Sequence, residues 1–165
     1  MSLEKAKNHL SRWQKSGDVK EHELSSATVE LASLALGIES RRIAKTLSFL
    51  NGERTILLVA AGDARVDSSL FKKCFGIKKA RMVPADEVER RTGHEAGGVC
   101  PFGVPDTADV YLDESLRRFE TVFPACGNSN SSIELTLAEL EECSEAKGWV
   151  NVCRQWQENP PLPES

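Results

Sequence analysis

The sequence has 165 residues, a net charge of −4 and 28% charged residues, a composition typical of one globular domain with its own core. Its apolar runs are too short to span a membrane, and no apolar signal core follows the N-terminus, so we expect a cytoplasmic protein without a membrane anchor. The five cysteines are scattered and odd in number, which argues against a disulfide framework and against a structural zinc site.

Apolar spacing and capping residues divide the chain into short helices and strands. The first half is predicted to contain, in order, a helix over 3–13, a strand over 19–24, a helix capped by Ser25 or Ser26 that ends at Gly37, strands over 43–50 and 55–61 joined by a tight turn, and a helix that begins at Asp67 and ends at Gly76. The second half is predicted to contain a strand over 79–83, a helix over 84–91, a glycine-rich segment over 93–103, a strand over 110–112, a helical turn over 113–119, a strand over 121–123, a polar turn over 126–131, a strand over 132–136, a helix over 137–146 and a strand over 149–152.

This order of elements predicts the α/β fold class. We expect a single compact domain over 1–155, with a twisted mixed sheet flanked by helices. Because neighbouring strands are separated mainly by short turns, the sheet is predicted to be built largely from hairpins and so to be largely antiparallel. Residues 156–165 include three of the seven prolines and are predicted to form a flexible tail.

Charge is distributed unevenly along the chain. Residues 41–91 hold 12 Lys and Arg against 6 Asp and Glu, whereas residues 92–165 hold 4 against 13. This basic middle segment is either an ordinary solvated surface or a face that attracts phosphates. Its cationic residues include Arg41, Arg42, Lys72, Lys73, Lys78, Lys79, Arg81, Arg90 and Arg91.

Lys45 lies inside an apolar strand pattern. Strand alternation places it on one face with Ile43, Leu47 and Phe49, beside residues expected in the core. A buried lysine is costly unless it is paired or functional. Two interpretations stay open: a functional ammonium, or a lysine at a strand edge whose stem reaches to water.

The glycine-rich segment over 93–103 does not have the spacing of a dinucleotide-binding loop or of a nucleoside-triphosphate loop. It is either a structural turn or a rigid backbone surface that cradles a small group. Cys100 in this segment could be a nucleophile only with a base such as His94, and we favour a buried structural cysteine. The polar turn with Asn128, Ser129 and Asn130 is either ordinary turn chemistry or a loop that faces a ligand.

Taken together and in order, four segments resemble the YbaK/EbsC family of aminoacyl-tRNA deacylases, which is related to the editing domain inserted in bacterial prolyl-tRNA synthetases. The resemblance covers about residues 20 to 153, and its specific marks are the lysine of the Lys45-Thr46-Leu47 strand and a G-x-x-x-P loop from Gly97 to Pro101. The segments are Arg42–Leu47, Gly97–Gly103, Val110–Asp113 and Cys126–Leu135.

The resemblance implies a compact α/β domain that hydrolyses the ester between tRNA, typically tRNA(Pro), and a small wrong amino acid such as Ala or Cys, without a metal or another cofactor. It implies a functional role for Lys45 and a catalytic loop formed by Gly97, Gly98, Val99, Cys100 and Pro101, with Cys100 as one wall of the pocket. Substrate contacts are expected from His22, Thr46, Phe102, Gly127, Asn128, Ser129 and Asn130.

The implied partners are misacylated tRNA and, for an editing factor that acts in trans, prolyl-tRNA synthetase, and we expect a monomer or a weak dimer. Two other function classes remain. One is a non-catalytic module of the same fold that binds tRNA or a nucleotide. The other is a hydrolase of small esters or thioesters that depends on Cys100.

Overall fold

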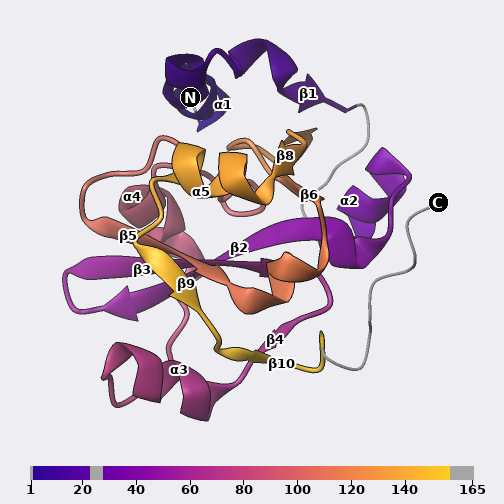
Figure 1. Ribbon diagram of the computed structural model, residues 1–165. Helices are drawn as coiled ribbons and strands as arrows, with labels where there is room; N and C mark the ends of the chain where they lie inside the picture. The colour runs from indigo at the N-terminus through magenta and orange to yellow at the C-terminus, as the bar shows by residue number, and fades with distance from the viewer. Residues whose placement is uncertain (1, 23–27, 157–165) are drawn as a thin grey trace.

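A six-stranded mixed sheet, in the order β8-β6-β2-β3-β5-β9, runs through the middle of the computed structural model, which describes residues 2–22 and 28–156 (Figure 1). The helices are α1 (Ser2–Leu10), α2 (Val29–Leu36), α3 (Ser68–Phe75), α4 (Val88–Thr92) and α5 (Leu137–Ser144). The strands are β1 (Lys20–Glu21), β2 (Ile43–Asn51), β3 (Arg54–Ala61), β4 (Arg65–Val66), β5 (Ala108–Asp113), β6 (Thr121–Pro124), β7 (Ser131–Ser132), β8 (Leu135–Thr136), β9 (Gly148–Val150) and β10 (Cys153–Arg154). Short 3-10 turns lie at Ser11–Trp13, Ser16–Asp18, Ser40–Arg42, Ala85–Glu87 and Glu114–Arg118.

The hairpin of β2 and β3 is the longest strand pair and confirms the predicted turn at 51–54. Asn51 faces Arg54 across the hairpin, and Gly52 between them has a φ of 65°, which a glycine adopts without the steric cost of a Cβ. The sheet is mixed, as predicted, and β6 with β8 is also antiparallel, but it has more parallel pairing than a sheet built largely from hairpins. Within the described six-stranded sheet, β2 with β6, β3 with β5 and β5 with β9 are parallel.

These parallel pairs have a physical reason that the sequence shows only weakly. Parallel neighbours need a long crossover connection, so no tight turn marks them in the chain. The strand β3 is buried at every position from Thr55 to Ala61, as expected for a central strand covered on both faces. Two-stranded sheets of β1 with β7 and of β4 with β10 add antiparallel pairing at the periphery.

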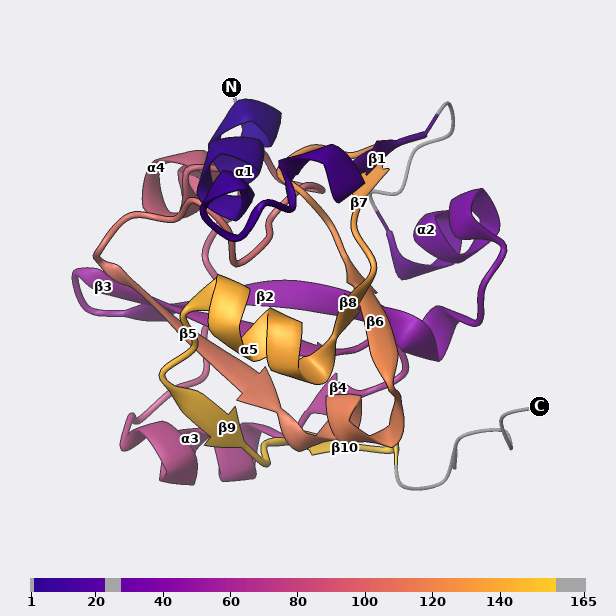
Figure 2. The same ribbon diagram turned by 45° about the horizontal axis from the view of Figure 1, so that its top comes forward.

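Helices cover the sheet from opposite sides. The helix α1 lies at one end of the molecule and α3 at the other in both orientations, and α5 lies between them (Figures 1 and 2). On the α3 side, the Phe71 ring lies 4.4 Å from the ring of Phe49. On the other side, Leu10 and Leu140 are fully buried with the central strands in one core.

Local signals place several element boundaries where they were predicted. The Asp67 side chain accepts a hydrogen bond from the Leu70 N–H at the start of α3, and Gly76 ends that helix in the left-handed conformation. The helix α2 begins instead at Thr28, whose side chain accepts from the Leu31 N–H. The predicted caps Ser25 and Ser26 lie outside the described residues.

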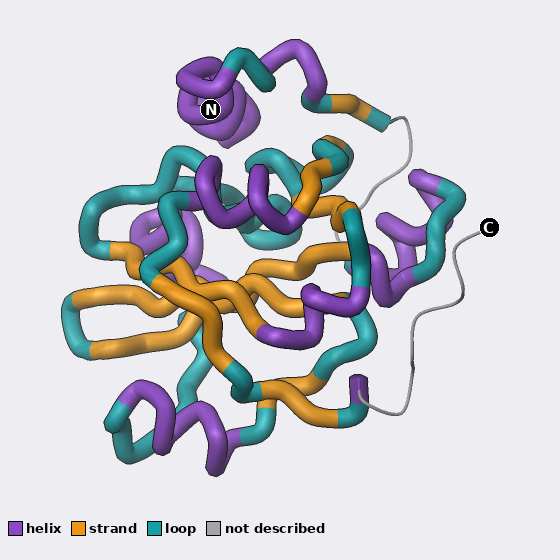
Figure 3. Tube along the Cα trace, viewed as in Figure 1, coloured by secondary structure: helices purple, strands orange, loops and turns teal. Residues whose placement is uncertain are grey.

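Other predicted strands are shorter or divided, as the tube in Figure 3 shows. The segment 79–83 contributes an isolated bridge between Met82 and Phe49 rather than a strand. The strand predicted over 132–136 is divided into β7, which pairs with β1, and β8, which pairs with β6. The strand predicted over 149–152 overlaps β9, which covers its first two residues, and β10 begins just after it.

The predicted tail begins within the ordered part of the fold. Trp156 donates its indole N–H to the Cys153 carbonyl oxygen, and its own carbonyl oxygen accepts from Arg118. The rest of the predicted tail, 157–165, lies outside the described residues. In the two described ranges, no helix has both the length and the apolar character needed to cross a bilayer.

Candidate functional site

Lys45 projects from β2 toward the turn that follows β3. Its amino group donates hydrogen bonds to the carbonyl oxygens of Gly62, at 3.3 Å, and of Ala64. Gly62 is required there because a Cβ would lie 2.0 Å from the Ser40 carbonyl oxygen. Within the described residues Lys45 forms no ion pair with a carboxylate, and burial lowers the pKa of its ammonium below the usual 10.5. The ammonium has three donors and two carbonyl partners, so one donor is available to a ligand.

Lys45 lines a cavity of about 240 Å³, which we call the Lys45 cavity. Its walls come from the start of β2, the helix α2, the Gly97–Pro101 loop and the segment that follows β6. Its mouth is partly open, and most of its lining is apolar. The lining residues are Thr28, Val29, Ala32, Leu36, Ile43, Ala44, Lys45, Thr46, Leu47, Gly97, Val99, Phe123, Ala125, Ser131 and Ser132.

Four of the residues predicted for the site therefore share this cavity: Lys45, Thr46, Gly97 and Val99. The sequence did not single out the residues of α2 or the serines of β7 as lining residues. For α2 the available signal was an apolar helix that begins just before the Lys45 strand. The serines of β7 carried no separate signal, because they were included in a predicted strand.

Two hydroxyl groups at the cavity are buried and have no hydrogen-bond partner within the described residues. They are the Oγ1 atom of Thr46 and the Oγ atom of Ser131. A buried hydroxyl without a partner costs free energy, and a polar ligand atom would remove that cost. These two groups therefore favour a ligand that carries hydrogen-bonding atoms into a mostly apolar cavity.

The two predicted loops pack directly against each other. A Cβ on Gly98 would lie 2.4 Å from the Asn128 Cα, so the two backbones can approach this closely only at a glycine. Gly127 has a φ of 98° and lies against the backbone of Ser2 and Leu3. Gly98, Gly127 and Asn128 do not line the cavity; they hold the loop that does.

His22 and Asn130 lie outside the cavity, bound to each other, and His22 contacts a residue that lines it. The His22 N–H donates to the Asn130 carbonyl oxygen at 2.7 Å, and the Asn130 amide donates to the His22 carbonyl oxygen at 2.9 Å. The His22 Nε2 atom lies 2.8 Å from the Oγ atom of Ser132, which lines the cavity. Neither His22, Ser129 nor Asn130 is itself a lining residue.

Cys100 is not a wall of the cavity, which corrects the prediction. It is fully buried, and its Sγ atom lies 3.5 Å from the His94 Nε2 atom and 3.7 Å from the Phe102 carbonyl oxygen. Burial raises the pKa of the Cys100 thiol to about 12. His94 donates from Nε2 to the Phe102 carbonyl oxygen, so the ring nitrogen nearest the thiol carries a proton and cannot accept one as a base. Cys100 therefore has a neutral, enclosed thiol, as expected for the buried structural cysteine that the sequence analysis favoured.

Pro101 and Phe102 also lie away from the cavity. The Phe102 ring is fully buried in the core, 6.0 Å from the His9 ring. It does not line the Lys45 cavity, where we had expected it to contact the substrate. Pro101 lines a separate depression with His9 and Arg12, beside α1. The Gly97–Pro101 loop therefore presents its first half to the Lys45 cavity and anchors its second half in the core.

Comparison with known proteins adds the family to this geometry. Residues 23–143 match the family model of the aminoacyl-tRNA editing domain. This chain belongs to the aminoacyl-tRNA editing domain family. The matched range contains the Lys45 strand, the Gly97–Pro101 loop and the polar turn, the segments on which the resemblance depended.

Relatives of this editing domain include a protein of similar length and parts of larger enzymes. It is 52% identical to the uncharacterized protein YwhH of Bacillus subtilis (strain 168), over 95% of this chain and 100% of YwhH. It is 28% identical over 90 residues to the proline--tRNA ligase of Caldicellulosiruptor bescii, and that alignment covers 54% of this chain and 15% of the ligase.

Solved structures confirm the fold class. A structure described as a candidate trans-editing enzyme for prolyl tRNA synthetase superposes with a TM-score of 0.82 at 27% identity, covering 93% of this chain and 97% of that protein. The hypothetical protein APE2540 superposes with a TM-score of 0.76 at 28% identity, covering 88% of this chain and 99% of that protein. In the part of this editing domain that the structure describes, no three His, Cys, Asp or Glu side chains are placed to hold a metal ion.

Proposed function

We propose that this editing domain is a trans-acting aminoacyl-tRNA deacylase. It would hydrolyse the ester of a misacylated tRNA, with tRNA(Pro) carrying a small wrong amino acid such as Ala or Cys as the substrate, in the cytoplasm where tRNA is charged. The observation that carries the proposal is the position of Lys45. Its amino group lies at a mostly apolar cavity and has carbonyl oxygens, but no carboxylate, as its described partners.

The reaction needs stabilisation of charge more than it needs a side-chain nucleophile. A water molecule, positioned by a free hydroxyl of the terminal ribose, attacks the ester carbonyl carbon. The bond between that carbon and the ester oxygen of the ribose breaks, and the ribose oxygen takes up the proton that the water gives up. The products are the amino acid and a tRNA with a free terminal hydroxyl. Negative charge develops on the carbonyl oxygen, and a cation or backbone N–H groups held in a dry site stabilise it strongly.

The residues around the cavity fit these roles. Lys45 can direct its remaining N–H at the developing oxyanion or at the terminal nucleotide. The N–H groups of Gly97 and Val99 have no hydrogen-bond partner within the described residues and border the same space. Thr46 and Ser131 offer hydroxyls to the polar atoms of the aminoacyl group or the ribose.

The size and lining of the cavity support a small amino acid. A mostly apolar wall formed by α2 and the start of β2 suits a short side chain, and such a chain is what a synthetase pocket discriminates poorly. The relation to part of a proline--tRNA ligase supports tRNA(Pro) as the substrate and prolyl-tRNA synthetase as a partner. We propose a monomer or a weak dimer as the working form.

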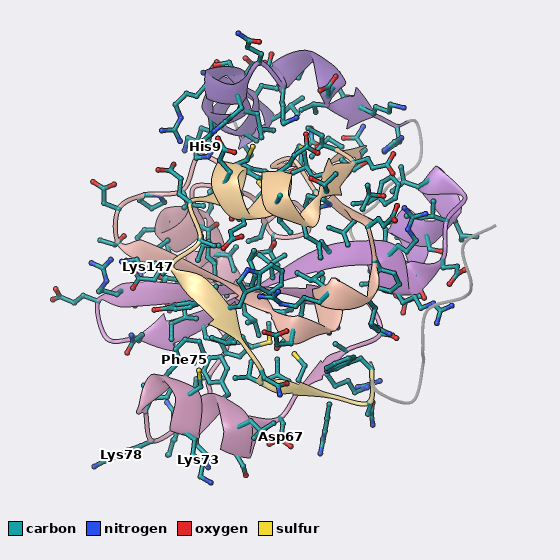
Figure 4. The ribbon with its side chains drawn as sticks, in the orientation of Figure 1. His9, Asp67, Lys73, Phe75, Lys78 and Lys147 are labelled. Carbon is teal, nitrogen blue, oxygen red and sulfur yellow. The ribbon has the colours of Figure 1, made fainter. Side chains whose placement is uncertain are left out.

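Substitution of Lys45 tests the proposal directly. With Ala-, Cys-, Ser- and Thr-tRNA(Pro) as substrates, Lys45→Ala should lower kcat/KM at least about 100-fold, because the charge that stabilises the oxyanion is lost. Lys73→Ala is the matched control, since Lys73 is an exposed lysine on α3 (Figure 4). Pro-tRNA(Pro) should survive with either protein.

Two outcomes would contradict the proposal in different ways. If the native protein binds tRNA but hydrolyses none of these substrates, the non-catalytic binding module of the same fold is correct. If Cys100→Ala rather than Lys45→Ala abolishes turnover, the cysteine-dependent hydrolase is correct, although the enclosed thiol gives that alternative no support.

A further inference from the structure

A polar groove adjoins the Lys45 cavity, and the two share Val29, Lys45 and Leu47 as lining residues. The groove has a volume of about 640 Å³. Its lining comes from β2, β4, β10 and nearby segments, and the pair of β4 and β10 lies at the end of the molecule opposite α1 in both orientations (Figures 1 and 2). Among its lining residues are Arg65 of β4 and Arg154 of β10.

Arg65 and Arg154 are direct partners across this strand pair. The register pairs Arg154 with Arg65 and Cys153 with Val66. Directly opposite residues of an antiparallel pair lie on one face with their Cβ atoms roughly 5 Å apart, and like charges in that position are destabilising. Both arginines are exposed, and within the described residues neither forms an ion pair or a side-chain hydrogen bond.

The third cation at this groove is Lys45 itself. Arg65 is close enough to act on the Lys45 charge and to help lower the pKa of its ammonium. The groove holds two acidic residues, and Asp63 is already paired with Arg118 through contacts of 2.5 and 2.9 Å. Glu30 of α2 is the other. Three cations without carboxylate partners thus gather at one groove, an arrangement that an anionic ligand would stabilise.

Several other basic residues of the chain do have carboxylate partners. Of the residues predicted to form a phosphate-attracting face, Arg41 and Arg42 pair with Glu39 and Glu134, and Arg90 and Arg91 pair with Glu87. Lys73 of α3 and Lys78, which follows that helix, differ, since both extend into solvent at the end where β4 and β10 lie (Figure 4). The N–H of Asp67 at the start of α3 donates to the Val152 carbonyl oxygen beside β10.

We propose that Arg65 and Arg154 form a phosphate clamp for the single-stranded 3′ end of tRNA. The clamp rests on the proposed function, because Lys45 joins the groove to the cavity that would hold the aminoacyl ester. Phosphates of the last nucleotides lie in the groove between the two guanidinium groups, and the terminal adenosine passes Lys45 into the cavity. Guanidinium groups suit this ligand because their planar donors bind phosphate oxygens in pairs.

The test compares Arg65→Gln/Arg154→Gln with Arg90→Gln, an exposed arginine of α4 that is paired with Glu87. The affinity for uncharged tRNA(Pro) and the kinetics on misacylated tRNA(Pro) are measured from 0.05 to 1 M salt. Each phosphate contact on a single strand is worth roughly 5-fold in affinity at 0.1 M salt, so the double variant should bind about 25-fold more weakly. KM should rise by a similar factor with kcat unchanged, and the difference should vanish near 1 M salt.

Two further readouts separate a clamp from a structural role. The melting temperature of the double variant should equal or exceed that of the native protein, because the substitution removes a like-charged cross-strand pair. Arg65→Lys/Arg154→Lys keeps both charges and should retain most of the salt dependence. Inorganic phosphate and AMP, added as competitors, should displace tRNA far less effectively than an oligonucleotide ending in CCA, which identifies the strand rather than a lone phosphate as the ligand.

The results distinguish this inference from the proposed function. Unchanged tRNA affinity in the double variant, with deacylation intact, overturns the clamp and leaves the function standing. A fall in kcat with unchanged KM also overturns it, because the arginines would then act in the chemical step. Weakened tRNA binding in a protein that hydrolyses no misacylated tRNA supports the clamp and removes the deacylase proposal.

Discussion

Lys45 and Cys100 show how the surroundings of a residue decide its chemistry. Both are polar groups inside apolar stretches of sequence, and both are covered by the fold. Lys45 lies at a cavity with carbonyl partners and a donor to spare. Cys100 is enclosed by its own loop, and its neutral thiol contacts a carbonyl oxygen. Partial burial at an open cavity therefore leaves Lys45 accessible to a ligand, whereas complete burial removes Cys100 from it.

Cys100→Ala tests the structural role of that thiol. Deacylation should stay within about 3-fold of the native rate, while unfolding in urea should show a loss of about 1–2 kcal/mol, because a buried atom is removed and a small cavity remains. The exposed Cys74 is the control, since Cys74→Ala should leave stability unchanged. A loss of kcat in a normally folded Cys100→Ala protein would contradict this assignment.

At the scale of elements, two loops far apart in sequence form one unit. The Gly97–Pro101 loop lies against the turn that contains Asn128, and that turn is held in place by His22 and by the start of α1. Neither loop is regular secondary structure, so close backbone packing takes the place of a hydrogen-bonded ladder. The cavity wall at Gly97 and Val99 depends on this contact.

Gly98→Ala should disrupt this unit. The added methyl group would meet the Asn128 backbone at 2.4 Å, so the loop must shift, and we expect a loss of roughly 2 kcal/mol or more together with lower activity. Gly148→Ala is the matched control, because nothing lies within 4 Å of its Cβ position and its stability should change by less than about 0.5 kcal/mol. Thermal unfolding measures the stability of both variants. An equal loss of stability in Gly98→Ala and Gly148→Ala would show that the two loops do not depend on each other.

At the scale of the whole molecule, one buried carboxylate joins three strands of the sheet. Asp109 of β5 accepts from Arg54 of β3 at 2.7 and 2.9 Å, and the Lys147 amino group lies 2.9 Å from the same carboxylate, just before β9. The Arg54 hydrogen bonds, aided by Lys147, lower the pKa of Asp109 from its usual 3.8 to about 2. Ion pairs to Asp109 thus connect β3, β5 and β9, the parallel strands that sequence patterns did not reveal.

This pKa shift predicts how stability depends on pH. The pKa is lower in the folded state, so the stabilisation is complete above the unfolded value of 3.8 and is lost as the pH falls from there toward 2. Because both cations are partly exposed, we expect a contribution of about 1–2 kcal/mol. Asp109→Asn should lose that amount at pH 7 and flatten the stability curve between pH 4 and 2, as urea unfolding would show. Asp106→Asn, an exposed neighbour, should keep the native pH dependence.

Much of the fold was predictable because its signals are local. The cap at Asp67, the end of α3 at Gly76 and the hairpin at Gly52 each depend on the backbone conformation of a few adjacent residues. The predicted strand over 79–83 failed because its pairing is limited to a bridge at Met82. The family resemblance was also readable, because the Lys45 strand and the Gly97–Pro101 loop keep their order and spacing in the chain.

The sequence alone determined the helices and strands with strong caps or turns, the unusual lysine of β2 and the family to which this editing domain belongs. The tertiary structure alone decided which strands of the mixed central sheet pair in parallel, that Cys100 is enclosed, and that Arg65 faces Arg154 beside Lys45. Local backbone preferences are fixed by neighbours in the chain. Burial, strand pairing and the meeting of charges depend on residues far apart in sequence, whose positions are set only when the whole core packs.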